Sequence, residues 1–273
     1  MLWLQVLILA VLQGITEFLP VSSSGHVIVG ASLFEQFGDV MDEKLTLNIV
    51  LHVGTLGSIL VFFRDRIVAL LGPDRRVIGL LVVGTLPAVA VGLMLKASPW
   101  GAGIEQTLEN PLVAGLMFPA TGVLLLWGMR HAGGQLACRD VGYHHAVVIG
   151  LFQAFGILPG ISRSGSTIVA SLGCGLRREE AAAFSFLLAI PALAGGGMLE
   201  VIDLLRKGPG DTPANMLLIG GLVSFLVGLV ALSWLLRWIR QGRLGLFACY
   251  LIPLGAAVVA WQLLSWGGGP LSY

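Results

Sequence analysis

Long apolar segments recur along this 273-residue chain, and they restrict its possible folds more than any other feature. Runs of about 19 residues match the roughly 30 Å hydrocarbon core that a helix must cross. Hydrophobic residues make up 56% of the sequence, charged residues only 11%, and mean hydropathy is +0.90, so the chain is too apolar for a soluble domain of this length. The alternating pattern of an outer-membrane barrel is absent. We therefore expect an all-α polytopic membrane protein.

Six segments are long and apolar enough to span the membrane: 45–63, 77–95, 111–129, 181–205, 215–236 and 244–266. Arginines concentrate in three of the connecting loops: 64–76, 130–142 and 237–243. By the positive-inside rule these three loops face the cytoplasm. The acidic stretch 35–43 and the loops 96–110 and 206–214 are then expected on the outer side.

The segments 1–34 and 143–176 must each begin and end on one side of the membrane, because the neighbouring spans fix both of their ends. Their second limbs are short, about 10 residues, which is too few for a helix to cross the hydrocarbon core. We therefore predict a re-entrant helical hairpin in each segment.

This order of elements repeats along the sequence. One hairpin and three spans occupy 1–129, and the same order recurs in 143–266, displaced by about 140 residues. Three crossings per unit invert the second copy, so the prediction is an inverted-topology repeat within a single membrane domain, 1–273. In such folds the broken or re-entrant helices meet at a polar cavity. The two hairpin tips should therefore face each other.

Both tips carry polar residues that are expensive at membrane depth. The first reads QGITEFLPVSSSGH from Gln13 to His26, and the second reads LPGISRSGST from 158 to 167. Gln13 and Glu17 are four residues apart and share a helix face. Pro20 is expected to end that helix, with Ser22 to Gly25 forming the turn.

This composition favours an anion site. Serine and glycine at a helix N-terminus leave backbone N–H groups free for a phosphate. Arg163 adds a fork of donors that suits phosphate oxygens, and Gly160 and Gly165 would let the backbone approach a ligand closely. Glu17 could hold a divalent cation, Mg²⁺ or Ca²⁺, that bridges to the phosphate. A lipid phosphate or diphosphate fits best, but composition alone does not choose between hydrolysis and transport.

The two strings look like the paired signature motifs of the bacitracin-resistance family of undecaprenyl-diphosphate phosphatases, written (E/Q)xxxE, PVSSxGH and PGxSRSxxT. The similarity extends to Asn48–Arg66 and Ala181–Ala194, and so covers most of the chain. Membership implies an enzyme that removes the terminal phosphate of undecaprenyl diphosphate in the bacterial plasma membrane. The product is the recycled lipid carrier of cell-wall synthesis, and the site implied by the family opens outward.

The resemblance also implies roles for individual residues. Ser23 is the proposed nucleophile, His26 the base or acid, Glu17 and Gln13 the polar and metal-associated pair, and Arg163 part of the phosphate clamp. The phosphate-binding set is Ser22, Ser24, Gly25, Ser162, Arg163, Ser164, Gly165 and Thr167. Gln13 stands where many members have Glu, which removes one carboxylate from the expected cation site.

Three alternatives stay open. A transporter or flippase for polyprenyl phosphate or another amphiphilic anion would share the architecture, and within the enzyme His26 or an activated water could attack in place of Ser23.

His52 lies in an apolar span with no carboxylate nearby in sequence, so a structural role is expected for it. The net charge of +1 gives nucleic acid no electrostatic support as a partner. Membrane lipids and a second copy in a homodimer are the remaining partners considered.

Overall fold

The computed structural model describes residues 2–36, 44–130, 134–207 and 213–266, which are almost entirely helical. Its helices, in chain order, are α1 (Leu2–Thr16), α2 (Ser23–Gln36), α3 (Lys44–Phe62), α4 (Arg64–Leu70), α5 (Arg75–Ala97), α6 (Gly101–Leu108), α7 (Pro111–Met129), the 3-10 helix η1 (Cys138–Asp140), α8 (Tyr143–Phe155), α9 (Arg163–Gly173), α10 (Arg178–Lys207), α11 (Ala214–Arg240) and α12 (Gly245–Trp266).

The predicted spans coincide with α3, α5, α7, α10, α11 and α12. Within the described residues five helices are long and apolar enough to cross a membrane, and α3 with α4 makes a sixth if this pair, bent by 74°, is one span. The predicted loops 64–76 and 96–110 contain the short helices α4 and α6, so treating them as plain loops was wrong. The long helices turn apolar side chains such as Leu86, Met94 and Leu218 outward, more than half exposed. This is a polytopic membrane protein.

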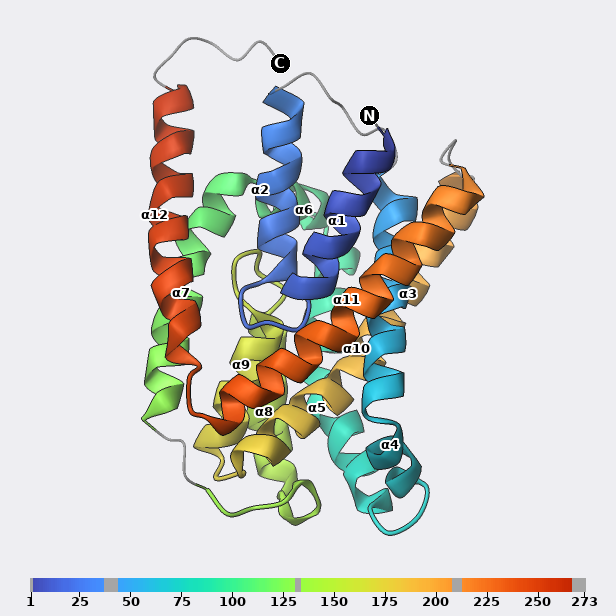
Figure 1. Cartoon of the computed structure of the whole chain (residues 1–273), viewed down its shortest axis with the longest axis vertical. Coiled ribbons are helices and arrows are strands. Elements are labelled where there is room, and N and C mark those ends of the chain that lie inside the picture. Colours follow the sequence, from blue (N-terminus) through green and yellow to red (C-terminus); the bar gives the residue numbers. More distant parts are fainter. Residues whose placement is uncertain (1, 37–43, 131–133, 208–212, 267–273) are drawn as a thin grey trace.

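Two pairs of short helices enter the bundle from opposite ends (Figure 1). Helix α1 descends from the end that holds the N-terminus to the middle of the molecule, and α2 returns to that end. Helix α8 rises from the other end, and α9 returns to it. At 14 residues, α2 is longer than the predicted second limb, whereas α9 has the expected length of 11 residues.

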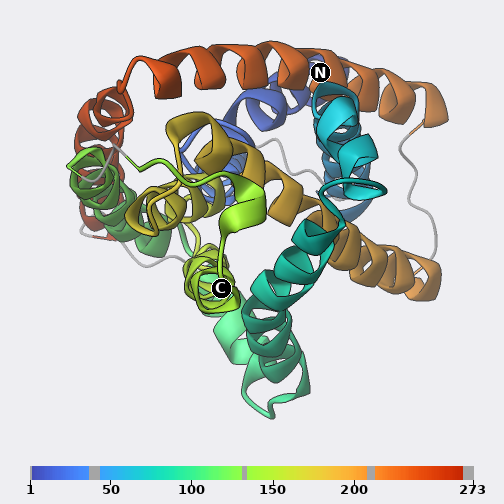
Figure 2. The ribbon, with the colours of Figure 1, turned by 90° about the horizontal axis from the view of Figure 1, so that it is seen from below.

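Long helices surround these pairs. Helix α12 packs along α7, and α11 packs against α3 and α1. Viewed from below, α11 runs along one whole side of the molecule (Figure 2). The arginine-rich loops 64–76 and 237–243 and the described part of the third, 134–142, gather at the lower end of Figure 1, as their common side assignment requires. Of the acidic stretch 35–43, residues 37–43 lie outside the described residues.

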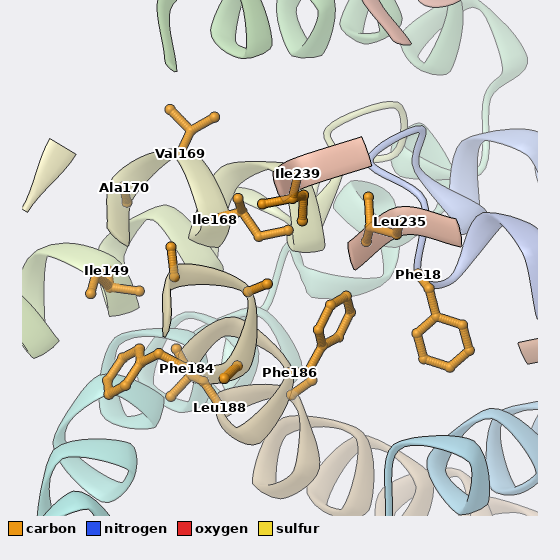
Figure 3. Packing of buried hydrophobic residues seen from close by; sticks show 14 of the residues in the cluster. Phe18, Ile149, Ile168, Val169, Ala170, Phe184, Phe186, Leu188, Leu235 and Ile239 are labelled. Carbon is orange, nitrogen blue, oxygen red and sulfur yellow. The ribbon is translucent and has the colours of Figure 1, made fainter. Parts of the chain in front are cut away.

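The hydrophobic core anchors the first hairpin turn. Phe18, fully buried, comes from the turn between α1 and α2 and meets the ring of Phe186 on α10 edge-on, with centroids 5.8 Å apart. Figure 3 shows these two rings beside Leu235 and Ile239 of α11. Because aromatic packing of this kind fixes the backbone that carries it, Phe18 also fixes the position of its neighbour Glu17.

A buried carboxylate ties the arginine-rich end together. Glu180 on α10 accepts a hydrogen bond from Arg66 Nη2 at 2.6 Å and one from the backbone N–H of Cys138 at 2.9 Å. These contacts hold α4 and the loop before α8 against α10. Burial raises the pKa of the Cys138 thiol, and the neighbouring Glu180 carboxylate raises it further.

Candidate active site

The first polar motif folds as a turn between two helices. Helix α1 ends at Thr16 and α2 begins at Ser23, so Glu17 lies in the turn while Ser23, Ser24 and Gly25 form the first turn of α2. The prediction that these three residues form the turn was therefore displaced by a few residues. Ser22 has φ 71°, a left-handed conformation that costs a residue with a Cβ about 1–3 kcal/mol. Its surroundings must hold it there.

The second motif repeats this arrangement. Helix α8 ends at Phe155, and the chain turns through Pro159 and Gly160 before α9 begins at Arg163. Ser162 caps α9, with its Oγ accepting a hydrogen bond from Gly165 N at 3.1 Å. Serine is favoured at this position because its side chain satisfies one of the unpaired N–H groups of the first turn.

The two turns contact each other, which confirms the expectation that the tips face one another. Gly160 N donates to Ser22 Oγ at 3.0 Å, and Ser164 Oγ donates to Leu19 O at 3.3 Å. A Cβ on Gly25 would lie 2.8 Å from Gly160 N, and Gly160 itself has φ 89°. Gly25 and Gly160 therefore permit the two backbones to approach one another. The predicted close approach of Gly160 and Gly165 to a ligand stays a prediction.

Glu17 accepts hydrogen bonds from residues of both motifs. Its Oε1 accepts from Arg163 Nη2 at 2.7 Å, and its Oε2 accepts from Ser23 Oγ at 2.8 Å and from Gln13 Nε2 at 3.1 Å. The Glu17 side chain is only 4% exposed. A carboxylate buried this deeply requires a paired cation and satisfied oxygens, and residues from both motifs supply them.

These residues enclose a pocket of about 170 Å³ between the two helix N-termini. Its polar lining consists of Thr16, Glu17, Ser22, Ser23, Ser24, His52, Ser162, Arg163 and Ser164. Arg163 Nη1 is buried and has no hydrogen-bond partner within the described residues. An unpaired guanidinium N–H beside several hydroxyls is a donor set that suits the oxygens of a phosphate group.

Other predicted site residues are engaged elsewhere. His26 is not among the described residues that line the pocket: its Nδ1 lies 2.7 Å from Ser22 O and its Nε2 2.8 Å from Tyr250 OH. The backbone N–H groups of Gly25 and Gly165 donate to Ser22 Oγ and Ser162 Oγ. The prediction that they are free was therefore wrong. The Thr167 hydroxyl bonds to Ser185 and to the backbone of α9.

His52 is an ionisable pocket residue that sequence reasoning missed. Its Nε2 lies 4.0 Å from Glu17 Oε2, although 35 residues of chain separate the two. The structural role expected for it rested on the lack of a carboxylate nearby in sequence, and the carboxylate is near in space instead. An ionisable ring inside an apolar helix was itself a signal, since such groups at membrane depth commonly mark functional sites.

The donor set around Glu17 does not fit a divalent cation held by the protein alone. No group of three or more His, Cys, Asp or Glu side chains suited to a metal ion occurs in the part of the chain that is described. Both oxygens of Glu17 already accept hydrogen bonds, one of them from a guanidinium, and Gln13 turns its NH₂ group toward the carboxylate. A hard cation would need oxygen ligands in these places.

Comparison with known proteins identifies the family of the chain. The family model described as bacitracin resistance protein BacA matches residues 6–257. The undecaprenyl-diphosphatase of Rhodopirellula baltica is 50% identical over 261 residues, which cover 95% of this chain and 98% of the relative. That of Desulfatibacillum aliphaticivorans is 40% identical, covering 94% and 98%, and undecaprenyl-diphosphatase 4 of Bacillus cereus is 37% identical, covering 95% and 97%. With a match over nearly its whole length, the chain belongs to the bacitracin resistance protein BacA family.

Proposed function

We propose that this protein is an undecaprenyl-diphosphatase, which removes the terminal phosphate of undecaprenyl diphosphate and leaves undecaprenyl phosphate. The observation that carries the proposal is the pocket in which Arg163, Glu17 and Ser23 meet between two helix N-termini, inside a membrane protein. Its relatives bear the name of this activity. Recycling the lipid carrier supports cell-wall synthesis, and it accounts for bacitracin resistance in the family.

The clamp comes from Arg163 and the first turns of α2 and α9. Arg163 Nη1 is unpaired, and Nη2 can exchange Glu17 for a phosphate oxygen. Phosphoryl transfer spreads negative charge over the transferred group, so fixed donors that surround it supply most of the catalysis. The hydroxyls of Ser22, Ser24, Ser162 and Ser164 complete the polar wall.

Ser23 is the nucleophile in this proposal. Its Oγ donates to Glu17 Oε2 at 2.8 Å, which orients the oxygen lone pairs away from the carboxylate and toward the pocket. Oγ then attacks the terminal phosphorus in line with the leaving polyprenyl monophosphate, and water hydrolyses the phosphoserine. Attack by an activated water with Ser23 only binding phosphate is the competing version of the step.

The architecture proposed for the membrane is an inverted-topology repeat, with repeat one in 1–129 and repeat two in 143–266. The hairpins 1–34 and 143–176 would be re-entrant, since α1, α2, α8 and α9 have only 11 to 15 residues each. Clustering of the arginine-rich loops at one end supports an orientation in which that end faces the cytoplasm. The pocket would then open to the outer face of the bacterial plasma membrane. We also propose that two copies of the chain form a homodimer in the membrane.

The divalent cation stays a prediction. Its protein ligand would be Glu17, and the phosphate oxygens of the substrate would have to supply the other ligands, because Gln13 provides no second carboxylate. The steps above are derived from the protein's own groups and do not depend on it.

Phosphate release from a polyprenyl diphosphate by the purified protein in detergent tests the function. A phosphatase releases orthophosphate where there is no membrane to cross, and the variant Arg163→Ala does not. Binding of the lipid without release in any cation would reject the phosphatase and favour a transporter or flippase.

A further inference from the structure

A second ionisable side chain lines the pocket from a helix outside both signature motifs. His52 lies on α3, its side chain is 26% exposed, and it lines the same pocket as Glu17, Ser23 and Arg163. The ring Nε2 is 4.0 Å from Glu17 Oε2, the same oxygen to which Ser23 Oγ donates at 2.8 Å. One carboxylate oxygen thus connects His52 with the proposed nucleophile.

The other ring nitrogen fixes the tautomer of His52. Nδ1 lies 2.9 Å from the carbonyl oxygen of Asn48, one helical turn earlier. A carbonyl oxygen only accepts hydrogen bonds, so Nδ1 carries the proton of the neutral ring. The lone pair therefore resides on Nε2, the atom that faces Glu17 and the pocket. This is the arrangement that a general base needs.

His26 lacks this property. Its two nitrogens are both occupied, by the carbonyl of Ser22 and the hydroxyl of Tyr250, and its ring stacks on that of Tyr250 with centroids 5.7 Å apart. Among the histidines in the described part of the chain, His52 lines the pocket and His26 does not. The two rings therefore differ in what they can do for a proton released at Ser23.

Glu17 is also a poor final acceptor for that proton. The guanidinium of Arg163 on Oε1 and the amide of Gln13 on Oε2 both stabilise the ionised carboxylate. A neutral imidazole next to it has no such restraint, and imidazole is suited to acid–base work near neutral pH.

We infer that His52 is the general base and acid of the reaction, a catalytic role that rests on the proposed function. As Ser23 Oγ bonds to the terminal phosphorus, the bond from phosphorus to the bridging oxygen breaks and its electron pair leaves with the polyprenyl monophosphate. The Oγ proton moves to His52 Nε2. When water then attacks the phosphoserine, Oγ leaves and regains this proton, while the proton lost by water leaves with orthophosphate to solvent.

For this transfer Ser23 Oγ and His52 Nε2 must come within hydrogen-bond reach, about 2.6–3.2 Å, and acid–base contacts commonly tighten when substrate binds. Glu17 then holds the positively charged imidazolium beside its carboxylate. Its place between His52 and Arg163 makes it a positioning residue for both.

The test compares phosphate release by wild type, His52→Gln, His52→Ala and His26→Gln at one fixed pH. Loss of a general base lowers kcat by about 10²–10⁴-fold, so we expect His52→Gln to lose activity in this range with KM little changed. His26→Gln should lose less activity than His52→Gln. Added imidazole should partly restore His52→Ala.

His144→Gln, in the first turn of α8, removes a ring of the same kind that is not among the described residues lining the pocket, and it serves as the matched control. A His52→Gln protein that elutes as wild type does in detergent but turns over within about threefold of it overturns the inference. So does a His26→Gln protein that loses as much activity as His52→Gln. Failure of wild type to release phosphate would reject the proposed function itself, which is a separate outcome.

Discussion

Arg163 and Glu17 join the two signature motifs through a buried ion pair, with Nη2 and Oε1 2.7 Å apart across 146 residues of sequence. The side chains are 16% and 4% exposed. The same guanidinium carries an unpaired Nη1, so it is only partly satisfied by the protein. Binding of a diphosphate would satisfy it, and would connect substrate recognition to the contact that holds the two hairpins together.

Replacement of Arg163 should therefore affect both stability and activity. Arg163→Ala leaves the Glu17 carboxylate buried without its cation, a change that costs about 3–5 kcal/mol at buried pairs. It also removes the clamp, so phosphate release should fall by at least about 10²–10³-fold, the range seen when one transition-state donor is lost. Thermal unfolding and phosphate release in detergent measure the two effects.

The double variant Glu17→Gln/Arg163→Ala separates them. With the carboxylate neutralised, stability should recover relative to Arg163→Ala while activity stays lost. Arg163→Lys keeps the charge without the fork of donors and should recover more stability than activity. Turnover near the wild-type rate in Arg163→Ala would refute the clamp.

Replacement of Ser23 distinguishes attack by Ser23 Oγ on the terminal phosphorus from direct attack by an activated water. Ser23→Ala removes the only side-chain oxygen that is hydrogen-bonded to Glu17 Oε2 among the described contacts. We expect complete loss of turnover and loss of phosphoserine in acid-quenched protein analysed by mass spectrometry. Ser233→Ala is the control, because this exposed serine on α11 bonds only to its own helix. Residual activity well above background in Ser23→Ala would favour water as the nucleophile.

Contact between the two hairpin tips depends on glycine. A methyl group at Gly25 would lie 2.8 Å from Gly160 N and 2.8 Å from Phe118 Cε1. Overpacking of this kind typically costs about 1–3 kcal/mol, so Gly25→Ala should lower the melting temperature and reduce activity together. Gly30→Ala on the same helix meets nothing within 4 Å, and should be neutral or stabilising by up to about 1 kcal/mol. Equal stability of the two variants would contradict close tip packing.

Much of this arrangement could be predicted from the sequence, because it depends on local composition. Hydrocarbon thickness sets the length of a span, so 111–129 coincides with α7 and 244–266 nearly with α12. The repeat in the sequence placed the two polar motifs opposite each other, and hydrogen bonds from Gly160 and Ser164 to the first turn bear this out.

What could not be predicted depends on contacts between distant elements. The place of Glu17 in the turn follows from the anchoring of Phe18 against Phe186, a contact between α10 and the first hairpin. The role of His26 as base or acid came from the family resemblance, and the motif gives no sign that the ring contacts Tyr250 on α12. Gln153 stands 140 residues after Gln13, at the displacement of the repeat, but position 157, which would then match Glu17, is isoleucine. The buried Gln153 amide has no partner within the described residues.

The buried thiol of Cys138 should report on the arginine-rich end. Its pKa is raised, so the folded protein holds the proton at pH values where an unfolded cysteine ionises, above about 8.5. The stability that the protonated Cys138 thiol contributes to the folded state is complete below that pH and is lost as pH rises further. Alkylation at pH 8 should be much slower at Cys138 than at the exposed Cys249, and Glu180→Ala should accelerate it by loosening the loop. Equal labelling of both thiols would contradict the burial.

Gln13→Glu tests the dependence on a divalent cation, because it introduces the carboxylate that many family members carry. In the wild type, Gln13 Nε2 donates to Glu17 Oε2 at 3.1 Å, and a glutamate there would place two like charges in contact. A cation relieves this repulsion by binding both carboxylates. We therefore expect Gln13→Glu to be less stable than wild type in EDTA, to gain thermal stability on addition of Mg²⁺ or Ca²⁺, and to require the cation for phosphate release more strictly. The matched variant Gln13→Met, uncharged and without a donor, should gain nothing from the cation beyond what wild type gains. A Gln13→Glu protein that responds to EDTA and to cations as wild type does would place any cation that the reaction uses away from these two side chains.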